Sequence, residues 1–292
     1  MSAIIPSAHD LAVENANAAY AKTQKTPFRQ FLLAIGGGLA IAIGFTFYVT
    51  SQQGALALPA GPMKVLGGVC FSTGIILVVV LGLDLFTSTT MTVLPLYEKK
   101  IRLPLFLRHW TLSVTGNLVG ALGLAVALFF AHQHMSSSGS WGEVALRTAA
   151  TKASHGPLET LILAILANIA VCAAVWMAQS GRSTVDKIFA CVFPISFFVA
   201  SSFEHSIANM FLLPMGLLTK YYGGAEFWNS QAVLESGKTF ADYAAFTPMA
   251  AVQNIVIVLI GNIIGGGFML ATFFYFTYIK NDVKKVKKVH GE

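Results

Sequence analysis

Six long apolar stretches dominate this sequence, and each approaches or exceeds the ~20 residues that a helix needs to cross a membrane. They cover approximately residues 31–50, 65–94, 111–131, 158–177, 188–218 and 250–278. Only 11% of the 292 residues are charged, whereas about 25% are charged in an average soluble domain. The sequence therefore predicts an all-α membrane protein with six transmembrane helices. This composition excludes a soluble, a disordered or a nucleic-acid-binding chain.

The distribution of Lys and Arg predicts how the spans are oriented. With six spans both chain ends lie on one side, and that side receives 14 of the 19 Lys and Arg residues. Because cytoplasmic loops are enriched in these residues, both termini are predicted to be cytoplasmic. Residues 1–28 are then a cytoplasmic N-terminal amphipathic helix, residues 29–280 the transmembrane domain, and residues 281–292 a basic cytoplasmic tail.

The second and fifth apolar stretches are too long for one straight span, and each contains an acid near its middle. These acids are Asp84 and Glu204. An ionisable group at this depth, inside a run longer than one helix, predicts that both spans are broken there. We expect Thr87 and Ser88 to lie on the loop that the first break creates. Non-helical backbone within a membrane is tolerated only where protein buries it or where it lines a cavity.

The two halves of the chain resemble each other in three successive segments. Residues 31–51 match 161–181, residues 82–95 match 202–214, and residues 115–122 (TGNLVGAL) match 260–267 (IGNIIGGG). Each half contains three spans, so the second copy must enter the membrane from the opposite side. The pattern predicts an inverted three-plus-three repeat, in which broken helices meet at a working site near the midplane.

Few polar side chains remain inside the predicted spans, where each costs about 2.5–3.5 kcal/mol at the bilayer centre. Glu204 and Asn209 are expected to hydrogen-bond the backbone groups that the break frees, and Asp84 to do the same in the first half. His205 is the functional candidate, because histidine titrates near physiological pH. The predicted spans contain no other histidine, because His109 is expected at the membrane interface.

The sequence predicts neither a metal site nor a cofactor. The three cysteines, Cys70, Cys172 and Cys191, lie in apolar runs without metal-binding spacing. The string E-H-S-I-A-N has one histidine, whereas the zinc motif H-E-x-x-H requires two. The Gly-rich runs lie within apolar spans and lack the strand–loop–helix context of a nucleotide site.

Four motifs together give the chain a family resemblance: GLDLFTS, AILANIAVCAA, FEHSIANMFLLPMG and IGNIIGGG. On these motifs the sequence resembles the formate–nitrite transporter family, and within it the formate-channel branch, over essentially its whole length. The resemblance implies an aquaporin-like protomer and a homopentamer with one pore in each protomer. Residues 29–280 would then be a channel domain.

The resemblance also implies roles for individual residues. His205 and Thr87 would face each other at the pore centre, and Lys152 with Asn168 would attract anions to the outer vestibule. Apolar constrictions on either side would be formed by Phe71, Ile75, Leu85, Phe86, Val175 and Phe198. Loop bracing would fall to Asp84, Glu204, Asn209 and Asn262.

The implied function is bidirectional, pH-dependent passage of formate and similar small monovalent anions across a bacterial cytoplasmic (inner) membrane. The expected partners are small monocarboxylates or other weak-acid anions, membrane lipid and further copies of the chain, without nucleic acid. We hypothesise that Lys152 gathers the anion, that Thr87 orients it, and that His205 shares or donates a proton in the dry centre.

Three alternatives remain at this stage. A nitrite or hydrosulfide channel would use the same site chemistry, since both anions have weak conjugate acids. A pore for water or glycerol would need an arginine selectivity device, and no Arg lies within a predicted span. An intramembrane enzyme would use Glu204 and His205 as an acid–base pair, but neighbouring helical residues point about 100° apart. The chain is therefore predicted not to be an enzyme.

Overall fold

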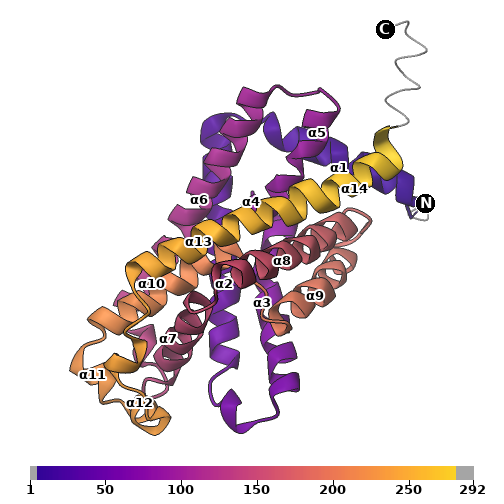
Figure 1. Ribbon diagram of the computed structural model, residues 1–292. Helices are drawn as coiled ribbons and strands as arrows, with labels where there is room; N and C mark the ends of the chain where they lie inside the picture. Colours follow the sequence, from indigo (N-terminus) through magenta and orange to yellow (C-terminus); the bar gives the residue numbers. More distant parts are fainter. Residues whose placement is uncertain (1–4, 281–292) are drawn as a thin grey trace, which may run out of the picture.

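The computed structural model describes residues 5–280, and no strand occurs within that range (Figure 1). Residues 1–4 and the basic tail predicted over 281–292 lie outside the described residues. The helices are α1 (Ala8–Thr23), α2 (Pro27–Ser51), η1 (Ala55–Ala57), α3 (Ala60–Leu81), α4 (Phe86–Thr89), η2 (Thr90–Thr92), α5 (Val93–Tyr97), α6 (Leu103–Phe130), η3 (Gln133–Met135), α7 (Ser140–Ala153), α8 (Pro157–Ala178), α9 (Thr184–Ala200), α10 (Ser206–Tyr222), α11 (Gly224–Trp228), α12 (Gln231–Ser236), η4 (Phe240–Tyr243), α13 (Pro248–Asn262), η5 (Ile263–Ala271), α14 (Thr272–Phe274) and η6 (Tyr275–Ile279). The all-α prediction is confirmed.

Five helical segments within residues 5–280 are long and apolar enough to cross a membrane. They are α2, α3, α6, α8 and the run Phe240–Ile279, in which α13 continues through the π-helical η5 and η6. The helix α9 has 17 residues, fewer than any of these five segments, and it contains Pro194. The count of six spans stays a prediction.

The second and fifth apolar stretches each contain two helices separated by extended backbone. The helix α3 ends at Leu81, Gly82 adopts the left-handed conformation with φ 67°, and α4 begins at Phe86. In the same way α9 ends at Ala200, Ser202 has φ 60°, and α10 begins at Ser206. The prediction that Thr87 and Ser88 lie on the loop was wrong. Both belong to α4, because the backbone resumes helical geometry immediately after Leu85.

Ser7 caps the N-terminal helix α1, because its side chain accepts from the Asp10 backbone N–H, and the helix packs against α5 and η6. Figure 1 shows it beside the end of the last helix, so the two ends of the described chain lie close together. Its buried face consists mainly of small residues, Ala12, Ala16 and Ala19 among them. Small side chains let α1 approach its neighbours closely, so it is part of the packed structure.

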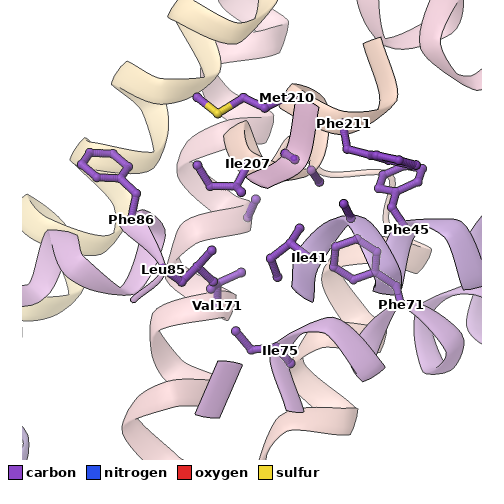
Figure 2. Packing of buried hydrophobic residues seen from close by; sticks show 14 of the residues in the cluster. Ile41, Phe45, Phe71, Ile75, Leu85, Phe86, Val171, Ile207, Met210 and Phe211 are labelled. Atoms are coloured by element: carbon purple, nitrogen blue, oxygen red, sulfur yellow. The ribbon is translucent and has the colours of Figure 1, made fainter. Parts of the chain in front are cut away.

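Glycines allow the long helices to pack backbone against backbone. A Cβ atom at Gly44 of α2 would lie 2.6 Å from the Phe71 carbonyl oxygen of α3. At Gly120 of α6 it would collide with the Ile35 carbonyl oxygen of α2. Close approach through small residues is the usual mode of helix association in lipid. Beside these contacts the aromatic rings of Phe45, Phe71 and Phe211 fill the core (Figure 2).

We expect Gly120→Ala to lower the melting temperature of the detergent-solubilised protein, because α2 and α6 must separate to admit the methyl group. Overpacking of this kind typically costs about 1–3 kcal/mol. The matched control is Gly123→Ala, one turn further along α6, where nothing lies within 4 Å of the added Cβ. That change should leave the melting temperature unchanged or raise it slightly. Equal melting temperatures for the two variants would contradict this account of the α2–α6 contact.

Candidate permeation site

The two interrupted segments meet at a buried pair of polar side chains. Thr87 Oγ1, on α4, lies 3.1 Å from His205 Nε2, immediately before α10. Thr87 is fully buried and His205 is 2% exposed. The structure therefore brings together the two residues that were expected at the pore centre, although 118 positions separate them in the sequence.

The second ring nitrogen of His205 has a fixed partner. The Ala208 backbone N–H donates to His205 Nδ1 at 3.1 Å, so the histidine caps α10. A nitrogen that accepts a hydrogen bond carries no proton, so a neutral ring bears its proton on Nε2. Nε2–H then donates to the Thr87 hydroxyl oxygen. The Thr87 hydroxyl proton is left free to bind a small molecule at this point.

A cavity of about 370 Å³ leads from the protein surface to His205. At its inner end the rings of Phe71 and Phe198 pack edge to face, with centroids 5.6 Å apart, and Phe198 stacks on the imidazole at 5.8 Å. At its outer end it is lined by basic side chains, namely Lys64, Arg147, Lys152 and His155. Phe71 and Phe198, two of the six constriction candidates, thus line this cavity together with His205.

The other four constriction candidates lie outside this cavity. Ile75, Leu85 and Phe86 are at most 1% exposed, and Val175 is 9% exposed. In Figure 2 Leu85 points toward Val171, whereas Phe86 turns away from it. Phe86 packs edge to face on Trp110, with ring centroids 5.6 Å apart. These four candidates are therefore packed in the protein core and do not line the cavity that reaches His205.

Two asparagines satisfy the backbone at the two breaks with the same set of hydrogen bonds. Asn262 Oδ1 accepts from Ser206 N–H at 2.9 Å, and its Nδ2 donates to the carbonyls of Ala164 and Glu204. Asn117 does the same for the first half. Its Oδ1 accepts from Phe86 N–H at 2.8 Å, and its Nδ2 donates to the carbonyls of Ala34 and Asp84. The two halves are thus built alike at this level of detail.

The acids at the breaks are buried and each has a lysine nearby. Glu204 Oε1 accepts from Lys152 Nζ at 2.9 Å, and Oε2 accepts from Asn209 Nδ2 at 2.6 Å. In the first half Asp84 Oδ1 accepts from Thr89 Oγ1 at 2.6 Å and lies 4.0 Å from Lys22 Nζ.

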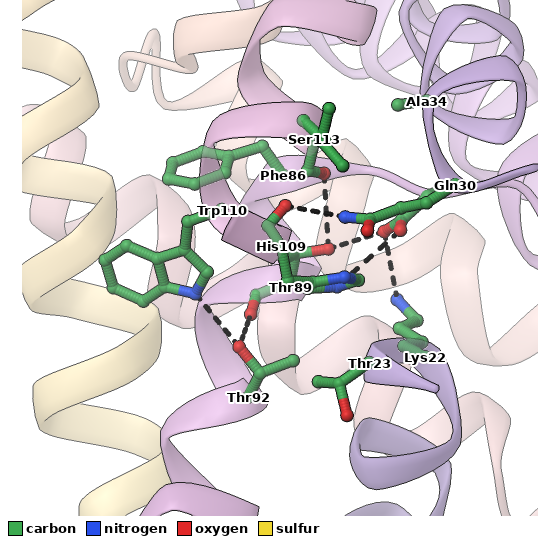
Figure 3. Close-up of polar contacts among 12 residues, drawn as sticks. Lys22, Thr23, Gln30, Ala34, Phe86, Thr89, Thr92, His109, Trp110 and Ser113 are labelled. Carbon is green, nitrogen blue, oxygen red and sulfur yellow. Dashed lines mark hydrogen bonds and ion pairs between the residues drawn. The ribbon is translucent and has the colours of Figure 1, made fainter. Parts of the chain in front are cut away.

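Lys22 reaches this position from the N-terminal helix α1 (Figure 3). It also donates to Ser88 Oγ at 3.1 Å.

One expectation about a single residue was wrong. Asn168 does not line the basic cavity with Lys152. It is fully buried and donates to the carbonyls of Thr87 and Asn262, because α8 faces the pore centre there. His109, which was expected at the membrane interface, lies within α6 and is fully buried, with Nε2 3.6 Å from Asp84 Oδ2, and its depth in the membrane stays a prediction.

The sequence analysis missed Asn117 and Lys22 as site residues, although the internal repeat contains both signals. In the match of 115–122 with 260–267, Asn117 stands opposite Asn262. When 31–51 is extended backwards against 161–181, Lys22 falls opposite Lys152. Within residues 5–280, no group of three or more His, Cys, Asp or Glu side chains is placed to hold a metal ion.

At the outer end of the cavity, His155 lies between two acids in the turn that joins α7 to α8. Its Nδ1 is 3.6 Å from Glu204 Oε1, and its Nε2 is 4.0 Å from Glu159 Oε1. The nearby Glu204 carboxylate raises the pKa of His155 above its usual value, and the charge of Glu159 acts in the same direction.

Three features are typical of a membrane transport protein. The helical chain has two interrupted segments, these meet at a buried polar pair, and a basic cavity leads to that pair. The comparisons with known proteins agree. The chain belongs to the formate/nitrite transporter family, whose profile matches residues 9–276.

The relatives it resembles are named as channels and transporters, which supports the prediction that the chain is not an enzyme. It is 41% identical to "Formate channel FocA" of Escherichia coli (strain K12) over 89% of this chain and 90% of the relative. It is 40% identical to the FocA of Haemophilus influenzae over 88% of this chain and 89% of the relative.

Among solved structures, the chain resembles "Pentameric formate channel with formate bound". The TM-score is 0.77 at 36% identity, covering 87% of this chain and 98% of that one. A second structure, "FNT family ion channel", has the same fold. The match has a TM-score of 0.74 at 23% identity and covers 92% of this chain and 99% of that one.

Replacing Asn117 by Ala should strongly destabilise the protein. The change leaves three buried backbone groups without their partner, and each such group costs about 1–3 kcal/mol. We expect a large fall in melting temperature in detergent or a loss of folded protein from the membrane fraction. Asn229→Ala, at an exposed position, is the control and should behave like wild type. A normal melting temperature for Asn117→Ala would show that the brace is dispensable.

The raised pKa of His155 predicts how its contribution to stability depends on pH. Because the folded-state pKa lies above the unfolded value of about 6.5, the contribution is full below that pH. It is lost as pH rises through the raised pKa. The melting temperature of wild type should therefore exceed that of His155→Gln most at low pH, and the difference should shrink as pH rises. Glu159→Gln should lower the pH at which the His155 ring titrates by NMR. A difference that grows with pH would refute the assignment.

Proposed function

We propose that the protein is a bidirectional, pH-dependent channel for formate and similar small monovalent anions in the cytoplasmic membrane of a bacterium. In this proposal six spans form an inverted three-plus-three repeat with an aquaporin-like path, and both termini are cytoplasmic. Five protomers assemble, each with its own pore. The pentamer is proposed from the similarity to the pentameric formate channel, and formate from that structure and the FocA relatives.

One observation carries the proposal, namely the Thr87–His205 pair at the inner end of a basic cavity. The free Thr87 hydroxyl proton would bind a small ligand, and the His205 Nε2–H, which donates to Thr87 in this structure, would turn to the same ligand. The phenyl rings of Phe71 and Phe198 restrict access to small ligands. A one-carbon monocarboxylate fits this site. Basic side chains at the mouth would attract its charge, the phenyl rings would admit only a small ligand, and Thr87 and His205 would hydrogen-bond its oxygens.

A comparison of two energies explains why a proton is involved. Moving an anion into an apolar constriction costs at least several kcal/mol. Protonating it first, for an acid with a pKa near 4 at pH 7, costs about three pKa units, or ~4 kcal/mol. The two are similar, so a central donor can decide which form passes. Low external pH lowers the second cost and favours uptake together with a proton.

His205 contributes by donating a hydrogen bond from Nε2 and sharing that proton with the permeant. Complete transfer would leave an imidazolate unless another proton reaches Nδ1. That nitrogen accepts the Ala208 N–H, so a full relay must first release the cap of α10. Sharing is therefore favoured over outright donation. Thr87 orients the permeant through its free hydroxyl proton.

Nitrite or hydrosulfide is the alternative permeant. The family profile covers nitrite transporters as well as formate transporters. Each anion has a weak conjugate acid and would use the same two donors.

The test is formate entry into proteoliposomes that contain a pH-sensitive dye, with the external pH stepped from about 8 to about 5. Wild type should take up formate with protons as the pH falls, and His205→Asn should lose the proton-linked component. Thr87→Val should lower uptake because the orienting hydroxyl is gone. His132→Asn, on the loop after α6, is the matched histidine control and should transport normally.

Each result of this assay has a defined meaning. Full proton-linked uptake by His205→Asn would reject the role of the histidine. Entry of nitrite or hydrosulfide without formate would keep the channel and change the permeant.

A further inference from the structure

We propose that Lys64, and not Lys152, supplies the free positive charge that collects the permeant anion at the mouth of the basic cavity. This inference rests on the proposed function, since it concerns how the same site obtains its ligand. It assigns a recognition role to a residue of α3 and changes the role that the sequence analysis gave to Lys152.

The charge of Lys152 is already matched. Its Nζ lies 2.9 Å from Glu204 Oε1 and donates as well to the Phe203 carbonyl at 3.2 Å. The side chain of Glu204 is fully buried and that of Lys152 is 14% exposed. A buried carboxylate must keep a partner, because an unpaired charge at this depth is strongly destabilising. Lys152 therefore holds Glu204 and the break before α10, and has little charge to offer an incoming anion.

The charge of Arg147 is matched in the same way. Its Nε lies 2.8 Å from Glu143 Oε1, one turn earlier on α7. The side chain of Glu143 is 11% exposed and that of Arg147 is 33% exposed, so the pair sits at the cavity wall. This pair contributes hydrogen-bonding groups to the mouth and no net charge.

Lys64 is the cation that remains. It is exposed, lines the cavity from the first turns of α3, and has no carboxylate within 4.0 Å among residues 5–280. The lining holds the permanent cations Lys64, Arg147 and Lys152, of which the last two are paired with a carboxylate. Lys64 is thus the unpaired permanent cation among the described residues that line the cavity.

His155 adds a second, pH-dependent charge at the same place. It faces Glu204 and Glu159, and Lys152 approaches the same Glu204 oxygen. Its proton therefore enters a group of charges that already contains two acids and one lysine. His155 loses its proton as pH rises, so the test is made near pH 8 to reduce its contribution relative to that of Lys64.

A lone exposed lysine acts through long-range attraction, which salt screens over a Debye length of about 10 Å at 0.1 M ionic strength. A charged mouth with apolar walls concentrates the oppositely charged ligand, and the effect falls as ionic strength rises. Lys64 should therefore lower the formate concentration at half-maximal flux without changing the maximal flux. The effect should appear only for anions that arrive from the side where the cavity opens.

The experiment measures initial formate flux in sealed membrane vesicles of both orientations, near pH 8. Salt is set to about 20 mM or about 300 mM, where screening is weak or strong. The variants are Lys64→Gln, Lys64→Arg and Lys152→Gln. The matched control is Lys238→Gln, because Lys238 is also an exposed lysine but pairs with Asp242 and lies outside the basic cavity.

We expect Lys64→Gln to raise the half-saturating concentration about three- to tenfold at low salt, from the cavity side only, which is a modest steering effect because a single charge is removed. The change should nearly vanish at high salt, and Lys64→Arg and Lys238→Gln should match wild type. Lys152→Gln should instead lower the maximal flux and the melting temperature at both salt concentrations.

Other results would overturn the inference. A Lys64→Gln variant with an unchanged half-saturating concentration would do so, and so would an equal change from both sides. A salt-dependent change in Lys152→Gln alone would return the collecting role to Lys152. If wild type moves no formate, the proposed permeant is wrong, and the same series run with nitrite tests Lys64 independently.

Discussion

The structure depends on how the backbone is satisfied where two helices stop inside an apolar environment. A buried N–H or C=O without a partner costs several kcal/mol in lipid, so such a break survives only if side chains replace the missing helical bonds. Asn117 and Asn262 do this with one oxygen and two N–H groups each, at equivalent places in the two halves. An amide side chain suits the task because it accepts and donates at once.

The central pair follows from these braces. Because α4 and α10 are held at their first residues, Thr87 and His205 point toward each other and stay 3.1 Å apart. The same geometry commits His205 Nδ1 to Ala208, directs the Nε2–H at the Thr87 hydroxyl oxygen and leaves the Thr87 hydroxyl proton for a ligand. Asn168 and Cys172 hold the Thr87 carbonyl from α8, so the hydroxyl is presented by a fixed backbone.

The buried charged groups are paired with one another at positions separate from the Thr87–His205 pair. Each break has a buried acid with a lysine from a preceding helix, α1 in the first half and α7 in the second. Pairing offsets part of the penalty of burying these groups, and it also means that a lysine near a pore is not automatically free to attract an anion. A cationic mouth therefore has to be assessed pair by pair, which is why Lys64 is distinguished from Lys152.

The sequence by itself determined that the chain is an all-α membrane protein and that its halves are related, whereas the pairing of Thr87 with His205 was only implied by the family resemblance. Hydropathy and the spacing of small and polar residues act along the chain, so they are readable without coordinates. Only the tertiary structure decided that Thr87 and Ser88 lie in a helix, that His109 is buried beside Asp84, and that Asn168 faces the centre. The tertiary structure also decided that Lys152 is paired with Glu204. These outcomes depend on the rotation and approach of helices far apart in sequence, and no local pattern records them.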